Sequence, residues 1–107
     1  MKRGEIWTVP GAGYAGTPRP AVIVQDDRFD ATASLTICLF TTDETEAPLF
    51  RLVVAPSELN GLRAASRLMV DKLTTVSKQR LGDRIGRLGD EDMLRLNRAI
   101  LVFLGLA

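Results

Sequence analysis

The pattern of apolar and polar positions predicts a series of short β-strands. The clearest is the unbroken apolar run over residues 21–24, which directly follows Pro18-Arg19-Pro20. A short apolar run bounded by turn-forming residues is typical of a buried central strand. Pro20 has no N–H for the ladder, so it can only open this strand. We expect further strands over residues 4–9, 35–42, 49–55, 68–76 and 84–88.

The C-terminal segment has the pattern of one amphipathic helix. Three acidic residues follow Gly89, and negative charge is favourable at a helix N-terminus. Apolar residues then recur at steps of three and four, which makes one apolar face. This face consists of Met93, Leu96, Ile100 and Phe103, broadened near the end by Leu101, Val102 and Leu104. We expect the helix to end at Gly105 and to be buried against the sheet or against another subunit.

The connections carry strong turn signals. Residues 10–18 contain three glycines between two prolines, with Tyr14 as the only large side chain. Single helical turns are expected over residues 56–61 and 77–82. Several short strands followed by one terminal helix predict a mainly β fold, a small β-barrel capped by a helix. No repeat or internal boundary is visible, so residues 1–107 are expected to form one domain.

The composition excludes several kinds of chemistry. The 107 residues carry a net charge of +1 and contain no histidine, so histidine-based catalysis and the usual zinc sites are excluded. The single cysteine, Cys38, allows no internal disulfide and fits a reducing cytoplasm. It lies between two apolar residues and is expected in the core. No apolar run approaches the length of a membrane span, and no signal peptide is visible, so no membrane partner is expected.

The order of these pieces resembles the MazF/PemK/Kid toxins over nearly the whole chain. The resemblance rests on residues 3–7 (RGEIW), 19–24 (RPAVIV) and 84–88 (RIGRL) followed by the terminal helix. It implies an SH3-like barrel of the CcdB/Kid/PemK type that forms a homodimer. It also implies metal-independent, sequence-specific cleavage of single-stranded RNA without a cofactor, and a cognate antitoxin as partner.

The resemblance also implies which residues act. RNA carries its own nucleophile, the 2′-hydroxyl, so cleavage would give a 2′,3′-cyclic phosphate and a 5′-hydroxyl. Arg19 matches the arginine of the family's Arg-Pro pair and would stabilise the phosphorane. Thr41 matches a threonine at the end of the next strand, and Asp71 aligns with the aspartate proposed as base in Kid-like members. The expected RNA contacts are Tyr14, Thr17, Thr42 and Lys72.

One departure from the Kid-like pattern leaves the role of Asp71 open. Kid-like members have an arginine two positions before the aspartate, where this chain has Met69. Asp71 is therefore either a base or an ion-pair partner of Lys72 or Arg67. Arg19 and Thr41 are then the main catalytic candidates.

Two other functions remain alternatives at this point. The apolar C-terminal tail has the character of the gyrase-binding tail of CcdB, a non-enzymatic poison on the same barrel, although Leu104 stands where CcdB-like proteins have a tryptophan. A catalytically silent member that binds only RNA or its antitoxin is the other alternative.

Overall fold

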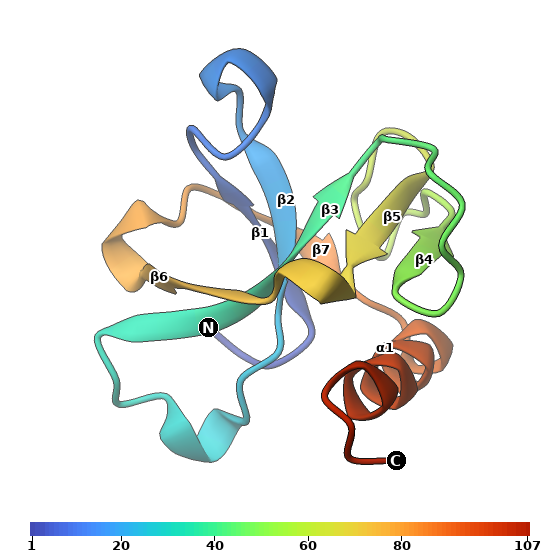
Figure 1. Cartoon of the computed structure of the whole chain (residues 1–107). Helices are drawn as coiled ribbons and strands as arrows, with labels where there is room; N and C mark the ends of the chain where they lie inside the picture. The colour runs from blue at the N-terminus through green and yellow to red at the C-terminus, as the bar shows by residue number, and fades with distance from the viewer.

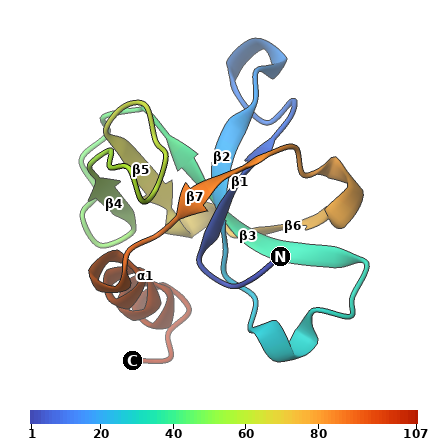
Figure 2. The same cartoon turned by 180° about the vertical axis from the view of Figure 1, so that it is seen from behind.

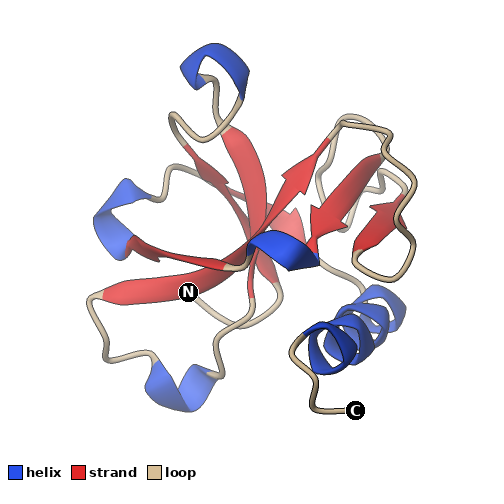
Figure 3. Cartoon of the chain, in the orientation of Figure 1, coloured by secondary structure: helices blue, strands red, loops and turns tan.

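Seven antiparallel strands form one strongly curled sheet, with a single α-helix beside it (Figure 1). The computed structural model describes all 107 residues. Figure 3 shows the strands meeting in the middle of the molecule. The strands are β1 (Glu5–Val9), β2 (Arg19–Ile23), β3 (Ser34–Thr41), β4 (Arg51–Val54), β5 (Ser66–Met69), β6 (Thr74–Ser77) and β7 (Arg84–Arg87), and the helix is α1 (Asp90–Phe103). The predicted mainly β fold with a terminal helix is confirmed.

The long strand β3 organises the sheet. The strand order is β4-β5-β3-β2-β1-β7, and β6 also pairs with β3. One edge of β3 pairs with β2, whereas the other edge pairs with β6 near its beginning and with β5 near its end. This shared pairing bends the sheet around β3 and places β4 and β5 beside the central strands, on the same side as α1, as the view from behind also shows (Figure 2).

The predicted continuous strand over residues 68–76 is wrong in one respect. It is divided into β5 and β6 by a 3-10 turn, η3 (Val70–Lys72). The physical reason is that β5 and β6 pair with different parts of the same strand, so the chain must change direction between them. The polar pair Asp71-Lys72, which interrupts the apolar pattern, lies in this turn.

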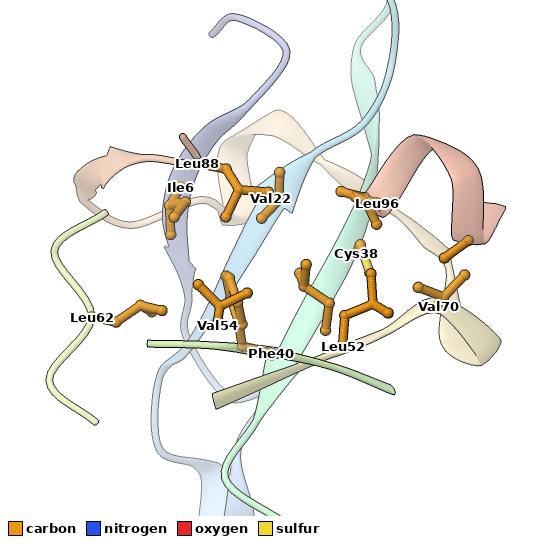
Figure 4. Close-up of a cluster of buried hydrophobic side chains, with 12 residues drawn as sticks. Ile6, Val22, Cys38, Phe40, Leu52, Val54, Leu62, Val70, Leu88 and Leu96 are labelled. Atoms are coloured by element: carbon orange, nitrogen blue, oxygen red, sulfur yellow. The ribbon is translucent and has the colours of Figure 1, made fainter. Parts of the chain in front are cut away.

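Apolar side chains fill both faces of the central strands. One cluster contains Ile6, Val22, Cys38, Phe40 and Leu96 (Figure 4). A second cluster contains the alternate positions of the same strands, Val9, Ala21, Ile23, Leu35 and Ile37, together with Val76. Burial on both faces explains why residues 21–24 form an unbroken apolar run. Burial also raises the pKa of the Cys38 thiol to about 12, which confirms a core role.

The helix packs one face against the first cluster and leaves apolar residues uncovered. Leu96 and Ala99 are buried, and Met93 and Ile100 pack against the cluster. Phe103 contacts Phe50 with ring centroids 6.0 Å apart, but Phe103 remains 46% exposed. We call the exposed apolar residues at this end the C-terminal patch; they are Leu101, Val102, Phe103, Leu104 and Leu106.

Two short segments are expected from the sequence to form single helical turns. The expected helical turn at residues 77–82 is present as the 3-10 turn η4 (Lys78–Arg80), where the Ser77 side chain accepts a hydrogen bond from the Gln79 N–H. The expected turn at residues 56–61 is present as one hydrogen-bonded turn, in which the Gly61 N–H donates to the Ser57 carbonyl four residues earlier. It folds around the buried side chain of Asn60, which accepts from the Ser57 and Leu62 N–H groups and donates to the carbonyl of Ala55.

The single α-helix has 14 residues. No helix in the structure has the length and apolar character that crossing a membrane requires.

Candidate active site

A hollow of about 270 Å³ opens where β2 begins and β3 ends. Its lining includes five of the seven residues that were predicted to act, from the β1–β2 loop, the start of β2, the end of β3 and the residue that follows β3. These five are Tyr14, Thr17, Arg19, Thr41 and Thr42. Asp71 and Lys72 do not line it. The structure therefore brings together most, but not all, of the candidate residues.

The register of β2 and β3 explains why Arg19 and Thr41 share this hollow. The two strands are antiparallel, and Ala21 lies opposite Leu39. Continuing the same register by two residues places Arg19 opposite Thr41. Residues two apart on a strand lie on the same face, so a guanidinium and a hydroxyl face one space from two rigid backbones.

Both polar groups are free to bind a ligand. The Arg19 side chain is half-buried and forms no hydrogen bond or ion pair within the chain. The Thr41 Oγ1 accepts a hydrogen bond from the Asp43 N–H at 3.1 Å, so its own hydrogen remains available for donation. A guanidinium and a hydroxyl that both donate into one hollow suit an anionic group such as a phosphate.

The β1–β2 loop forms the rim of the hollow and presents Tyr14. The Gly13 N–H donates to the Thr17 carbonyl, and the Thr17 hydroxyl donates to the Tyr14 carbonyl. A Cβ on Gly13 would lie 2.5 Å from the Thr17 Oγ1, so this closed loop requires glycine there. The loop leaves Tyr14 91% exposed, so its ring is accessible for stacking on a planar partner.

Asp71 lies in an ion pair away from the hollow. Its two carboxylate oxygens accept from the Arg51 Nε and Nη2 at 2.8 and 3.1 Å. These hydrogen bonds from Arg51 lower the pKa of Asp71 below its usual value. From the sequence, Lys72 or Arg67 is the expected ion-pair partner of Asp71, and both are wrong; the partner is Arg51. Arg51 lies directly opposite Met69 in the β4–β5 pair. Strand β4 therefore supplies a guanidinium beside the position where Kid-like members have an arginine and this chain has Met69.

The Arg51–Asp71 pair predicts how stability depends on pH. Because the folded state lowers the pKa of Asp71, the pair stabilises the fold above the unfolded pKa of about 4, and this contribution is lost as pH falls through the folded pKa. We expect the free energy of unfolding to fall by about 1 kcal/mol or less across this window, because the pair is partly exposed and solvent screens it. Urea unfolding at a series of pH values should show a smaller fall for Asp71→Asn. Asp30 is exposed and its side chain has no partner, so Asp30→Asn is the control. The assignment would be contradicted if Asp71→Asn kept the wild-type dependence of the free energy of unfolding on pH while Asp30→Asn changed it.

Arg67 is a further charged group near the hollow that the sequence did not single out as functional. It lies opposite Thr41 in the β3–β5 pair. Its guanidinium donates to the Asp43 carbonyl and forms an ion pair with Glu46 at 3.1 Å. The partners come from the acidic loop between β3 and β4, so Arg67 holds this loop beside the end of β3. A cross-strand position of this kind has no local sequence signal.

The sequence matches a family model described as the PemK-like, MazF-like toxin of type II toxin–antitoxin systems, over residues 2–104. It is 54% identical to the probable endoribonuclease MazF of Mycolicibacterium smegmatis, covering 100% of this chain and 99% of that protein. It is 30% identical to the endoribonuclease EndoA of Bacillus subtilis, covering 99% of this chain and 96% of that protein.

Solved structures agree with the sequence comparison. An endoribonuclease in complex with its cognate antitoxin, from a mycobacterial species, superposes with a TM-score of 0.83 at 26% identity, covering 100% of this chain and 97% of that one. A MazE–MazF structure from Deinococcus radiodurans superposes with a TM-score of 0.79 over 100% of this chain and 97% of that one. At 14% identity, the latter supports the fold alone.

Proposed function

The chain belongs to the PemK-like, MazF-like toxin family of type II toxin–antitoxin systems, and we propose that the hollow between Arg19 and Thr41 is where it cleaves RNA. The function is that of an endoribonuclease toxin, in agreement with the relatives named above. The observation that carries the proposed location is the unpartnered Arg19 guanidinium, which shares a hollow of about 270 Å³, wide enough to admit a phosphate, with the free Thr41 hydroxyl.

The proposed reaction uses the RNA's own 2′-hydroxyl. Its oxygen forms a new bond to the adjacent phosphorus, the bond from phosphorus to the 5′-oxygen breaks, and the products are a 2′,3′-cyclic phosphate and a 5′-hydroxyl. Arg19 and Thr41 donate hydrogen bonds to the non-bridging oxygens, where negative charge increases in the transition state. The reaction is metal-independent in this proposal, because the guanidinium supplies the positive charge.

The proton transfers are assigned from the positions of the ionisable groups. The leaving 5′-oxygen takes a proton from Arg19 or from a water that Arg19 orients. The 2′-hydroxyl gives its proton to water. Asp71 is not assigned as the base, because it lies outside the hollow and because the hydrogen bonds from Arg51 lower its pKa, which makes it a weaker base. In this proposal Asp71 stabilises the fold, and folded Asp71→Asn should still cleave RNA. Loss of cleavage in folded Asp71→Asn would favour the Kid-like role as base.

The remaining candidate residues are proposed to bind the flanking RNA. Tyr14 stacks on an unpaired base, while the Thr17 and Thr42 hydroxyls bind the sugar–phosphate backbone beside the cut. Lys72 is exposed and outside the hollow, and it is proposed as a more distant backbone contact. Single-stranded RNA suits these groups, because its bases are free to stack and its backbone is flexible.

We propose that the active form is a homodimer in which a second copy covers the C-terminal patch. Five apolar residues exposed together at the end of α1 would otherwise remain in contact with water. An antitoxin is the other proposed partner, as in the structure of an endoribonuclease with its cognate antitoxin. We further propose a single domain over residues 1–107 and a cytoplasmic location, where both RNA and a reduced Cys38 occur.

The CcdB-like alternative is not favoured. A poison that acts only through the C-terminal tail would not require the hollow around Arg19 and Thr41, and the relatives are named as endoribonucleases. The exposed C-terminal patch, which could have supported that alternative, has an equally direct explanation as the dimer interface.

Incubation of the purified protein with a long single-stranded RNA, in excess chelator, tests the proposal. We expect cuts at a recurring short sequence, mapped by primer extension. Arg80→Ala is the control, because Arg80 is an exposed arginine outside the hollow and should not affect cutting. Cutting that requires added metal would contradict the mechanism, and no cutting under either condition would contradict the function.

A further inference from the structure

A second, larger hollow adjoins the proposed active site. Its volume is about 450 Å³, and it lies between the start of β2, the β4–β5 loop and the start of β7. Figure 2 shows the β4–β5 loop lying beside β7 on this side of the molecule. The two hollows share the lining residues Pro18, Pro20, Thr42 and Ser66. An RNA strand bound at Arg19 can therefore continue directly into this second hollow, whose volume is that of a small-ligand pocket.

The walls of the second hollow are fixed by the fold. The β4–β5 loop is held by the buried Asn60 and packs on β7 at Gly61, where a Cβ would lie 2.0 Å from the Ile85 carbonyl oxygen. On the other side, the Asp83 N–H donates to the Thr8 Oγ1 at 2.9 Å, and the Gly82 N–H donates to the Thr8 carbonyl. The backbone of this hollow is therefore in place before any ligand binds, and the cost of ordering falls on the exposed side chains of Arg63 and Asp83.

Two opposite charges line this hollow without a partner. Seven of the eleven arginine side chains form a hydrogen bond or an ion pair, and the four that do not are Arg19, Arg63, Arg80 and Arg98. Arg19 and Arg63 line the two adjoining hollows. The Asp83 carboxylate also lines the second hollow and has no partner, although its backbone N–H does. The site thus offers free donors and free acceptors, with Leu62 and Ile85 as apolar lining.

We infer that this second hollow is a subsite for a guanine nucleotide of the RNA substrate, next to the cleaved phosphate. The inference rests on the proposed function. Guanine has two neighbouring acceptors, O6 and N7, which suit the fork of Arg63. It also has two neighbouring donors, N1–H and the N2 amino group, which suit the two oxygens of Asp83. Adenine and the pyrimidines lack one or both of these pairs.

Cleavage of an RNA pool randomised on both sides of a mapped cut tests the specificity. We expect wild-type protein to favour guanine at one position beside the cut, and Asp83→Asn and Arg63→Gln to reduce that preference by about tenfold or more. Cutting of RNA without guanine at that position should be unchanged. Asp30→Asn and Arg80→Gln are the matched controls, since both residues are exposed, form no side-chain interaction and lie outside both hollows.

A binding measurement separates this inference from the proposed function. Fluorescence anisotropy with 2′-O-methylated RNA hexamers, which a 2′-hydroxyl reaction cannot cut, reports the guanine preference independently of cleavage. Loss of this preference in Asp83→Asn supports the subsite even if wild-type protein cuts no RNA. Equal preferences in wild type, Asp83→Asn and Arg63→Gln, or a wild-type preference for another base at that position, would overturn the inference while leaving observed cleavage intact. Thermal melting verifies that each variant is folded.

Discussion

Replacing Arg19 by alanine is expected to reduce kcat/KM for RNA cleavage by about 10²-fold to 10³-fold. The guanidinium would stabilise charge that increases only in the transition state, so most of the loss should appear in kcat. Arg19 forms no hydrogen bond or ion pair within the chain, so the free energy of unfolding should change by no more than about 0.5 kcal/mol. Single-turnover cleavage of a short RNA, together with urea unfolding, measures both quantities.

Two further variants make this prediction specific. Arg19→Lys keeps the charge but loses the planar fork, so it should recover only part of the rate. Arg80→Ala removes an exposed arginine elsewhere and should leave the rate unchanged. If Arg19→Ala retained full activity, the hollow between Arg19 and Thr41 would not be the site of cleavage.

The double substitution Leu101→Asp and Leu104→Asp is expected to convert the homodimer to a monomer. Both side chains belong to the C-terminal patch and are 43% and 54% exposed in the single chain, so the fold of each protomer should tolerate the change. Burying four carboxylates in a twofold interface should weaken association by about 10³-fold or more. Light scattering coupled to size exclusion should give twice the 11.7 kDa chain mass for wild type and the single mass for the variant.

The control for the dimer is Phe29→Asp. Phe29 is an equally conspicuous exposed residue, at 59%, but it lies in the 3-10 turn η2 (Asp27–Phe29) and is not part of the C-terminal patch. It should leave the dimer intact. A dimer that survives the double aspartate substitution would place the interface elsewhere, and the C-terminal patch would then need another explanation.

The sequence predicts the strands best where both faces are buried. Residues 21–24 are apolar without interruption because alternate side chains enter two separate clusters, and this pattern is visible without any tertiary information. The helix is equally clear, because Leu96 and Ile100 repeat with helical spacing. The break at η3 is not visible in the same way. It arises because β5 and β6 share one partner strand, which is a property of the pairing and not of residues 70–72.

The sequence likewise predicts one part of the candidate site and not the other. Arg19 and Thr41 each stand at a strand end, and the antiparallel register of β2 and β3 brings these ends together. The partner of Asp71 could not be identified from its neighbours, because Arg51 is twenty positions away and reaches it across the β4–β5 pair. Arg63 and Asp83 are also distant in sequence, and only the packing of the β4–β5 loop against β7 places them around one hollow.

A single 2′-deoxy substitution in the RNA tests whether its own 2′-hydroxyl attacks the phosphate bound in the hollow. A short RNA that carries the mapped cleavage sequence is compared with the same RNA containing a single 2′-deoxynucleotide on the 5′ side of the cut. We expect cleavage of the first, with a 2′,3′-cyclic phosphate and a 5′-hydroxyl identified by mass spectrometry, and no cleavage of the second. Equal cleavage of both at the same bond would show that water or a side chain, and not the 2′-hydroxyl, is the nucleophile.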